Sequence, residues 1–147
     1  MSMMEIKKIG TEYVDACALI YKKTFAEEPW YEIYDTDMIK KYFIHCCNDT
    51  LYGGYVAYDN KMYGFITYFI KPSAAGNVLY IDELCVTKEA RKRGIGTSLI
   101  NKVKDLLEEN CCVSILIHTD KKTDAYKLYK SLGFEQDDSV VALYKNF

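Results

Sequence analysis

The feature that most constrains the fold is a stretch in which a strand-like segment leads, through a basic turn that contains glycine, into a helix-like segment. Residues 78–86 are rich in β-branched and aromatic side chains, which predicts a strand. Residues 94–109 place Leu99 and Val103 on one apolar stripe, which predicts a helix. A second strand is predicted over residues 113–117. Because a helix joins the two strands, we expect them to run parallel in one sheet.

The rest of the chain predicts a further set of helices and strands around this unit. They are expected, in chain order, as a strand over 4–9, a helix from Thr11 to near Pro29, a helix from Met38 to about Cys47, strands over 55–58 and 62–70, a helix over 123–132 that Gly133 ends, and a last strand over 140–144. Asp35 or Thr36 is suited to cap the second helix. Asp59-Asn60-Lys61 is a hairpin signal, so the strands that it joins should be antiparallel. The order predicts a mixed-sheet α+β fold in a single domain, residues 1–147.

The composition is that of a globular protein of near-neutral charge. Of the 147 residues, 50% are hydrophobic and 27% are charged, and the formal net charge is −2. A chain of this length can bury a core without disulfides or a metal. The net charge creates no field that would attract nucleic acid, no apolar run is long enough to span a membrane, and the first residues hold no apolar signal-peptide core. We therefore expect a cytoplasmic protein that binds neither nucleic acid nor membrane.

Cysteine and histidine are not spaced as metal ligands. The six cysteines include two adjacent pairs, Cys46-Cys47 and Cys111-Cys112, and no pair with the spacing of a zinc site. The two histidines, His45 and His118, lie far apart in the sequence. We expect reduced, structural cysteines and no metal.

The turn before the 94–109 helix has the composition of an anion site. Both arginines of the chain, Arg91 and Arg93, lie in it with Lys92 between them. Unpaired N–H groups at a helix N-terminus attract anions, and Gly94 and Gly96 let a phosphate approach the backbone. The stretch therefore favours a diphosphate ligand, although neither the P-loop pattern nor the dinucleotide G-x-G-x-x-G is present. A solvated run of charge is the alternative interpretation.

Three motifs together resemble the GCN5-related N-acetyltransferase (GNAT) superfamily. Arg91-x-x-Gly94-x-Gly96 is similar to the acyl-CoA loop of that family, and Glu83-Leu84-Cys85-Val86 resembles the end of its fourth strand. Ala125-x-x-x-Tyr129-x-x-x-Gly133-Phe134 resembles its tyrosine-bearing helix, although Lys122 stands where many members carry an asparagine. The resemblance implies an α+β fold with α/β/α layers, a mixed and mostly antiparallel sheet of six or seven strands, and about four helices. It also implies acetyl-CoA as co-substrate and a homodimer.

The resemblance assigns roles by position. Backbone groups of Leu84, Cys85 and Val86 would pair with the pantetheine arm and the thioester, in a splay between the 78–86 and 113–117 strands. Alongside Arg91, the amides that would hold the pyrophosphate are those of Lys92, Arg93, Gly94, Ile95, Gly96 and Thr97. Tyr129 would protonate the departing thiolate, because a phenol is a donor at neutral pH. The alternative for Tyr129 is a core tyrosine on an amphipathic helix.

The acceptor amine needs a base, because an ammonium has no lone pair with which to attack a thioester. Asp82 and Glu83 precede the residues expected to contact the acetyl group. Regular strand alternation predicts that the two side chains point to opposite faces, with Asp82 on the face of Leu84 and Val86. We take Asp82 as the preferred base and Glu83 as the second candidate. The alternative is that an acid at this place only accepts hydrogen bonds from a neighbouring loop.

The acceptor site is expected near residues 26–37, which hold five acids and no base. Glu28, Trp30 and Tyr31 are the candidate substrate contacts, and Tyr34 is a further candidate for the lining of the pocket. Glu27-Glu28-Pro29-Trp30 is similar to a segment of aminoglycoside 6′-acetyltransferase-like members. Such an acidic, aromatic rim suits an aminoglycoside, a polyamine-like small molecule or a protein amino group. Aromatic residues near a proline can instead close the edge of a core. Two alternative functions remain. One is a non-catalytic acyl-CoA-binding or regulatory module on the same fold, and the other is an interaction domain.

Overall fold

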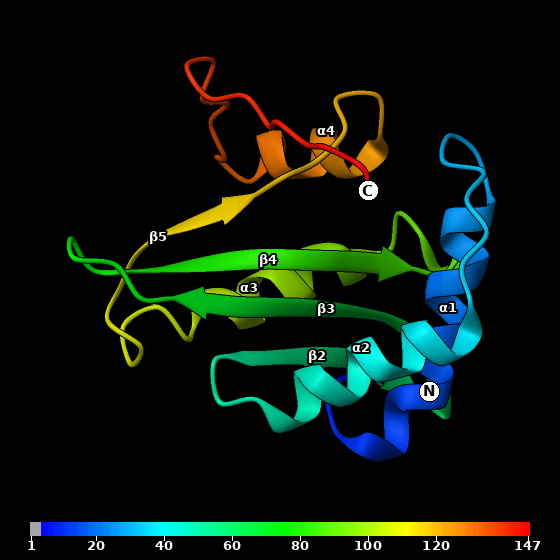
Figure 1. Ribbon diagram of the computed structural model, residues 1–147. Helices are drawn as coiled ribbons and strands as arrows, with labels where there is room; N and C mark the ends of the chain where they lie inside the picture. The colour runs from blue at the N-terminus through cyan, green and yellow to red at the C-terminus, as the bar shows by residue number, and fades with distance from the viewer. Residues whose placement is uncertain (1–3) are drawn as a thin grey trace.

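The computed structural model describes residues 4–147 and builds them around one five-stranded sheet (Figure 1). The first three residues of the predicted domain lie outside the described part. The elements are β1 (Glu5–Lys8), α1 (Val14–Ala26), α2 (Thr36–Asn48), β2 (Tyr52–Asp59), β3 (Lys61–Lys71), β4 (Asn77–Val86), α3 (Ile95–Lys104), β5 (Cys112–Ile117) and α4 (Asp124–Ser131). Short 3-10 turns at Thr11–Tyr13 and Lys88–Ala90 precede α1 and α3.

The strand order is β1-β2-β3-β4-β5, with antiparallel pairing up to β4 and a parallel β4–β5 pair. The parallel pair is joined through α3, which confirms the expected crossover. Asn60 turns the β2–β3 hairpin with a positive φ of 62°. The mixed and mostly antiparallel sheet is confirmed, although it has five strands in residues 4–147 and not the six or seven expected.

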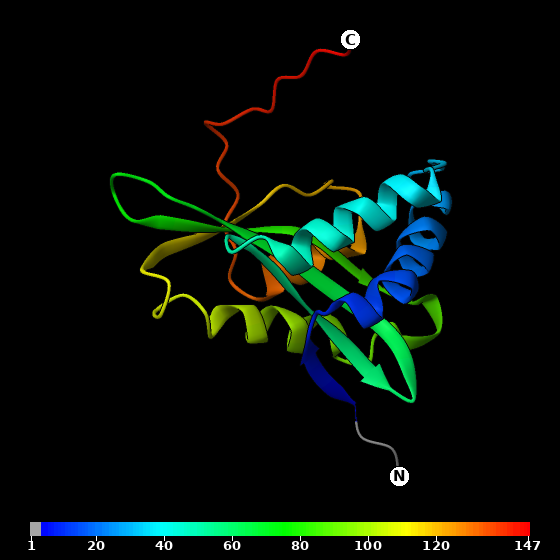
Figure 2. The ribbon, with the colours of Figure 1, turned by 60° about the horizontal axis from the view of Figure 1, so that its bottom comes forward.

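The expected strand over 140–144 is not formed, which is one reason for the lower strand count. Every residue from 135 to 147 is exposed, and the segment runs away from the body of the molecule (Figure 2). A strand exists only when a neighbouring strand pairs with its backbone, and none lies beside this segment. The residue types of this segment favour β structure, but no strand forms.

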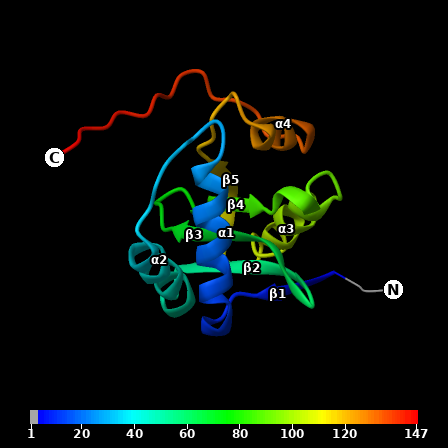
Figure 3. The ribbon, with the colours of Figure 1, turned by 90° about the vertical axis from the view of Figure 1, so that its right-hand side faces the viewer.

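Helices cover both faces of the sheet. Figure 3 shows α1 and α2 on one face and α3 on the other, which confirms the α/β/α layers. The core on the α1–α2 side contains Cys17, Phe43, Phe65 and Cys85, all nearly inaccessible to solvent. The core on the α3 side centres on a second set of buried side chains, which includes Leu79, Ile81, Leu99, Ile100 and Tyr129. The two cores fix β3 and β4 between the helical layers.

Helix ends follow the predicted signals in two of three places. The Asp35 carboxylate accepts the Met38 N–H at 3.0 Å and caps α2, and Gly133 follows α4 with φ 90°. The third helix, expected to reach residue 109, ends at Lys104. It ends early because residues 105–111 form a series of turns, in which Asn110 Nδ2 donates to the Leu106 carbonyl at 2.9 Å.

All six cysteines are free thiols, and three of them, Cys17, Cys46 and Cys85, are buried. Among residues 4–147, no group of three or more His, Cys, Asp or Glu side chains is gathered as a metal site would require. In the same part of the chain, no helix has the length and apolar character needed to cross a membrane.

Candidate active site

The site begins where β5 separates from β4. The register of the parallel pair runs from Asn77 opposite Cys112 to Ile81 opposite Ile117 and ends there, while β4 continues to Val86. Figure 1 shows β5 turning away from β4 toward α4. From Asp82 to Val86, β4 therefore pairs with β3 on one side and faces an opening on the other. This is the splay that the family resemblance implies.

Backbone alternation shows which groups face the opening. The Thr87 N–H donates to the Tyr63 carbonyl at 2.8 Å, so odd-numbered residues at this end of β4 direct their backbone groups toward β3. Cys85 is therefore turned to β3, in contrast to the expectation that its backbone would meet the substrate. Leu84 and Val86 face the opening. The Val86 carbonyl accepts from Arg91 Nε at 3.1 Å, which leaves the Leu84 N–H and C=O and the Val86 N–H for an extended ligand.

The N-terminus of α3 lies at one end of this opening and has the geometry of a phosphate cradle. Gly94 caps the helix in the left-handed region, with φ 79°, and a Cβ built on it would meet no atom within 4 Å. The first helical hydrogen bond is donated by the Ser98 N–H to the Gly94 carbonyl at 3.0 Å. The N–H groups of Ile95, Gly96 and Thr97 precede it and carry the positive end of the helix dipole. These groups fit a diphosphate.

The two loop glycines have different tasks. Gly94 supplies the left-handed turn beside open space. A Cβ at Gly96 would lie 2.9 Å from the Leu128 side chain and 4.0 Å from that of Leu84. Gly96 therefore lets α3 approach α4, the helix that carries Tyr129, beside β4.

The basic residues of the loop are not equivalent. Arg91 ties the loop to the end of β4 through the Val86 carbonyl, and its guanidinium also lies 3.8 Å from the Glu27 carboxylate. Arg93 lies over the Tyr63 ring, 5.9 Å from its centroid, while the Lys92 side chain is exposed. Arg91 therefore joins the anion loop to the acidic segment after α1. The sequence presented these as separate features, and no local signal indicated the contact.

Tyr129 is held by the end of α4. Gly133 N–H donates to the Lys130 carbonyl and Phe134 N–H donates to the Tyr129 carbonyl, both at 3.1 Å, the paired bonds of a Schellman motif. The Phe134 ring packs on the Tyr129 ring at 5.4 Å between centroids. Tyr129 is only 3% exposed. The glycine and phenylalanine of the sequence motif thus orient the tyrosine.

The Tyr129 phenol is a proton donor over the whole physiological range. Burial raises its pKa above the usual value of 10, and the nearby Cys85 and Glu83 side chains raise it further when they carry negative charge. Tyr129 belongs to the buried cluster against which Leu84 and Val86 pack, at this end of β4. A neutral phenol there can protonate a leaving thiolate.

The prediction that Asp82 and Glu83 point to opposite faces is wrong. The β3–β4 register shifts between Thr67 and Tyr68, so that Thr67 pairs with Glu83, Tyr68 pairs with Ile81, and Asp82 is the extra residue of a bulge. A bulge adds one residue to one strand and cancels the alternation at that point. Both carboxylates consequently lie on the α1–α2 face, away from the α3-side core that holds Leu84.

Asp82 is locked in a hydrogen-bond network. The Tyr42 hydroxyl, from α2, donates to the Asp82 carboxylate and lies 2.8 Å from Thr67 Oγ1. The same Thr67 oxygen accepts the Glu83 N–H at 3.1 Å. The network fixes the bulge, and one carboxylate oxygen of Asp82 is hydrogen-bonded to Tyr42.

Glu83 lines a pocket between α1, α2 and β4. The pocket has a volume of about 210 Å³ and is lined by Tyr21, Tyr34, Met38, Ile39, Tyr42 and Glu83. Burial raises the pKa of Glu83 from 4.5 to about 7, the Asp82 charge adds to this, and a hydrogen bond with Tyr21 offsets part of it. A carboxyl group with such a pKa both binds and releases a proton near neutral pH. The geometry thus favours Glu83 over Asp82 as a base.

Of the aromatic residues expected to line a substrate pocket, Tyr34 does so, and Trp30 and Tyr31 do not. Tyr31 is exposed, Glu28 is exposed, and Trp30 packs edge-on against Phe25 at 5.0 Å between centroids. None of these three lines the pocket, and the structure does not bring them to Glu83. The tyrosines that do so come from the buried stripes of α1 and α2 and from the segment between them. For Tyr21 and Tyr42, the spacing in the sequence indicated core packing only.

Comparison with known proteins identifies the family. The family model described as "Acetyltransferase (GNAT) family" matches residues 10–134. Human N-alpha-acetyltransferase 30 is 35% identical over 68 residues, 46% of this chain and 19% of that protein. Pig (Sus scrofa) thialysine N-epsilon-acetyltransferase is 36% identical over 67 residues, 45% of this chain and 39% of that protein. The chain thus spans well under half the length of these curated relatives.

Solved structures show the same fold over nearly the whole chain. A possible acetyltransferase from Clostridium difficile 630 superposes with a TM-score of 0.85, 23% identity and 99% coverage of both chains. Aminoglycoside N-acetyltransferase AAC(6')-Iy in complex with CoA superposes with a TM-score of 0.82 and 18% identity, over 100% of this chain and 97% of that chain. With the family match covering most of the sequence, the chain belongs to the acetyltransferase (GNAT) family.

Proposed function

We propose that the protein transfers the acetyl group of acetyl-CoA directly to a primary amine in a ternary complex. The observation that carries the proposal is the open edge of β4 beyond Ile81, which lies between the α3 N-terminus, the Tyr129 phenol and the Glu83 pocket. An extended thioester seated along this edge would have a diphosphate cradle at one end. Its reacting end would then have an acid and a base within the same region.

The two titratable groups support two complementary roles, a base at Glu83 and an acid at Tyr129. The Glu83 carboxylate takes a proton from the acceptor ammonium, which frees the nitrogen lone pair. The nitrogen then forms a bond with the acetyl carbon and the carbon–sulfur bond breaks, while the Val86 N–H is available to the carbonyl oxygen as charge develops on it. Tyr129 gives its proton to the departing sulfur, and the second proton that the nitrogen loses as it becomes an amide returns the phenolate to the phenol. Asp82, bonded to Tyr42, raises the pKa of Glu83 and adds negative charge near the ammonium.

We propose Glu83 as the base in place of Asp82, the preferred candidate from the sequence. Glu83 lines the pocket, and its raised pKa suits proton transfer at neutral pH. Asp82 remains a positioning residue whose charge acts on Glu83. Replacement of Asp82 should therefore alter the pH profile more than it alters the maximal rate.

A cationic acceptor is supported by the surroundings of the pocket. Its walls include three tyrosines, whose ring faces attract an ammonium, and its carboxylate compensates the charge. The named activities of the relatives act on amines, which is consistent with an aminoglycoside, a polyamine-like molecule or a peptide amino group. Three of the five acids in residues 26–37 already have partners: Glu27 contacts Arg91, Glu32 contacts Tyr34, and Asp35 caps α2.

The acceptor proposal is tested with the two remaining acids of that segment. Glu28 and Asp37 are exposed, so Glu28→Gln with Asp37→Asn removes two charges without disturbing the helix cap or the Arg91 contact. We expect KM for polycationic acceptors to rise and KM for acetyl-CoA to stay unchanged. The matched control is Glu5→Gln with Asp59→Asn, two acids at β1 and the β2–β3 turn. An unchanged KM for every active amine would contradict a role for the acidic segment.

A further inference from the structure

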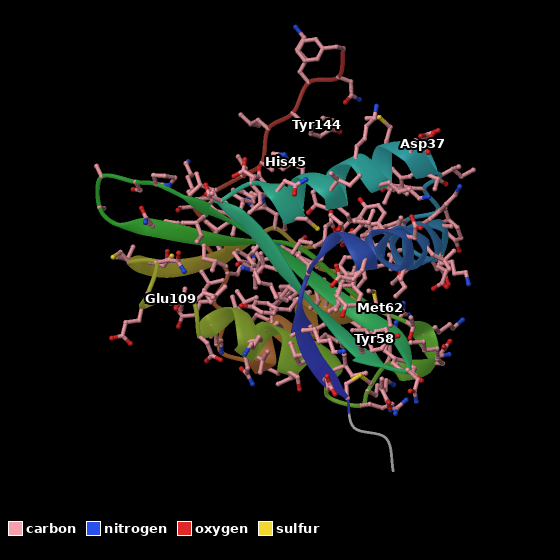
Figure 4. The ribbon with its side chains drawn as sticks, turned by 90° about the horizontal axis from the view of Figure 1, so that it is seen from below. Asp37, His45, Tyr58, Met62, Glu109 and Tyr144 are labelled. Atoms are coloured by element: carbon pink, nitrogen blue, oxygen red, sulfur yellow. The ribbon has the colours of Figure 1, made fainter. Side chains whose placement is uncertain are left out.

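A second cavity lies beside the β1–β2 edge, across the sheet from the β4 opening. It has a volume of about 430 Å³, about twice the 210 Å³ of the Glu83 pocket, which is within the usual size range of small-molecule sites. Its walls are the ends of β1 and α2, the first half of β2, the end of β3 and the turns after α3. Figure 4 shows two residues at this end of the molecule on opposite sides of the sheet, His45 in the last turn of α2 and Glu109 beyond α3.

The cavity forms because β1 stops before the start of β2 is reached. Lys8, the last residue of β1, pairs with Tyr55, and the Ile9 N–H then donates to the Gly54 carbonyl at 2.9 Å. β2 begins earlier, at Tyr52, so within residues 4–147 its first residues have no neighbouring strand on that side. The turns after α3 form the far wall of the space that this leaves.

Two buried tyrosines open onto this cavity. Tyr55 and Tyr68 are each 9% exposed, and their rings stack at 6.4 Å between centroids. A Cβ at Gly53 would lie 2.5 Å from the Tyr68 hydroxyl, so this glycine makes room for the phenol. Within residues 4–147, neither hydroxyl has a hydrogen-bond partner, and neither is enclosed by protein, since the one enclosed side-chain polar atom without a partner is Thr87 Oγ1. Because buried polar groups are nearly always hydrogen-bonded, the two hydroxyls require a partner inside the cavity.

Two charged side chains of opposite sign line the cavity, and neither has an ion-pair partner in the described part of the chain. They are Lys8, from the end of β1, and Glu109, from the turns after α3, and both are exposed, so a ligand can reach them. The third charged residue, Asp49, already has partners. Its carboxylate accepts the Leu51 N–H at 2.8 Å and lies 3.7 Å from His45 Nε2. One cation and one anion are therefore available to a ligand.

The two phenols are neutral at physiological pH. Burial raises the pKa of Tyr68 to about 12, and the charges of Tyr55 and Glu109 contribute to this. Burial also raises the pKa of Tyr55, with smaller contributions from the charges of Glu109 and Asp105. A neutral phenol donates one hydrogen bond and accepts others. The two hydroxyls can therefore bind either an ammonium or a carboxylate.

These groups select for a zwitterion. A ligand with only negative charge would be repelled by Glu109, and a ligand with only positive charge would be repelled by Lys8. A ligand with one ammonium and one carboxylate pairs with both side chains. The other walls include the apolar side chains of Ile9, Ile70 and Leu106, which suit an apolar body on the ligand.

We propose that this cavity is a binding site for a free α-amino acid with an apolar side chain. The carboxylate lies at Lys8, the ammonium at Glu109, and the apolar side chain against Ile70 and Leu106. The two buried phenols complete the hydrogen bonds of the charged groups. The site is separate from the proposed acetyl transfer, because no described residue lines both this cavity and the Glu83 pocket.

Calorimetry with L-leucine and L-phenylalanine tests the proposal. We expect both to bind. The N-acetyl derivatives lack the ammonium and the amides lack the carboxylate, so each should bind roughly 10–100-fold more weakly than the parent amino acid. Absence of binding by both amino acids, or equal affinity of the derivatives, would overturn the proposal.

Charge-removing variants assign each end of the ligand. Glu109→Gln should weaken the amino acid by the same roughly 10–100-fold and should not weaken the N-acetyl derivative further. Lys8→Gln should weaken the amino acid and should not weaken the amide further. Glu108→Gln removes a neighbouring exposed acid that does not line the cavity, and it should bind the amino acid as the wild type does. An unchanged affinity in both Glu109→Gln and Lys8→Gln would contradict the site.

An amino acid also carries an amine, which the acceptor pocket would bind under the proposed function. Binding in the second cavity should persist in Glu83→Gln and weaken in Glu109→Gln. The reverse pattern would show that the amino acid occupies the acceptor pocket, and would overturn the proposal. Because the readout is binding and not turnover, failure of the acetyl-transfer proposal would leave this result unaffected.

A thiol in the cavity wall reports where the ligand lies. Cys47 lines the cavity and is half-buried, whereas Cys111 is exposed and lies outside its lining. Alkylation of each thiol by a maleimide is followed by peptide mass spectrometry with and without L-leucine. The amino acid should slow the alkylation of Cys47 in proportion to the bound fraction and leave that of Cys111 unchanged. An unchanged rate for Cys47 at saturating L-leucine would place the ligand elsewhere and overturn the proposal.

Discussion

The pKa of Glu83 leads to a quantitative prediction for the pH dependence of acetyl transfer. A general base acts only when it is deprotonated. With a pKa of about 7, the deprotonated fraction of Glu83 rises from ~9% at pH 6 to ~91% at pH 8, about a tenfold change. We therefore expect kcat/KM to rise by about tenfold across this interval, with an inflection near pH 7.

The assay follows thiol release at saturating acetyl-CoA, with kcat/KM for the acceptor measured from pH 5.5 to 9. The acceptor binds as an ammonium, and an alkyl ammonium has a pKa of about 10.4, so the acceptor adds no inflection of its own near pH 7. Glu83→Gln should lower the rate by roughly 10²–10⁴-fold and remove the inflection near pH 7. The same inflection in Glu83→Gln, or a flat wild-type profile between pH 6 and 8, would refute the assignment.

The matched variant is Asp82→Asn. Because the Asp82 charge raises the pKa of Glu83, its removal should move the inflection to lower pH and leave most of the rate. The opposite result, in which Asp82→Asn abolishes the inflection and Glu83→Gln retains it, would return the base role to Asp82.

Three further predictions concern the acid, the fold and the pH dependence of stability. Tyr129→Phe should lower kcat by about 10²-fold or more with little change in acetyl-CoA affinity by calorimetry, and an unchanged kcat would remove Tyr129 from the acid role. Gly133→Ala forces a side chain into a φ of 90° and should cost about 1 kcal/mol, read as a loss of roughly 2–4 °C in Tm. Ser131→Ala, at the last residue of α4, is the control. Folded Glu83 keeps its proton between pH 4.5 and about 7, where the unfolded chain releases it. The free energy of unfolding should therefore fall by up to about 3 kcal/mol over this interval in urea titrations, and Glu83→Gln should not show this part of the decrease.

Local signals of the sequence correctly predicted the elements that local physics determines. The Asp35 cap, the Asn60 turn and Gly133 at the end of α4 each depend on one residue and its own backbone. The parallel β4–β5 pair followed from the intervening helix. These features need no knowledge of distant contacts.

The predictions that differ depend on tertiary contacts. The bulge at Asp82 is set by Thr67 and Tyr42, which are 15 and 40 positions away in the sequence, so strand alternation alone placed Asp82 on the wrong face. Residues 140–144 have strand-forming side chains, but no described strand pairs with their backbone. The residue types were informative in both cases, and their partners were not visible in the sequence.

The same distinction applies to the candidate site. The anion loop is contiguous, so the sequence predicted Gly94 and the N-terminus of α3 directly. The pocket combines tyrosines from α1 and α2 with Glu83 of β4, and their apolar spacing is that of ordinary core positions. Only the fold shows that these side chains surround a carboxyl group with a raised pKa.

The central claim is that this chain is a direct acetyltransferase, and thiol release from acetyl-CoA by the purified protein tests it most directly. A panel of amines is assayed: an aminoglycoside, spermidine, a lysine analogue and a peptide with a free N-terminus. We expect amine-dependent release with at least one of them, and loss of that release in Glu83→Gln. Binding of acetyl-CoA without release on any amine would support a non-catalytic module and refute the proposed activity. Release that is unaffected by Glu83→Gln would refute the role of Glu83 as the base.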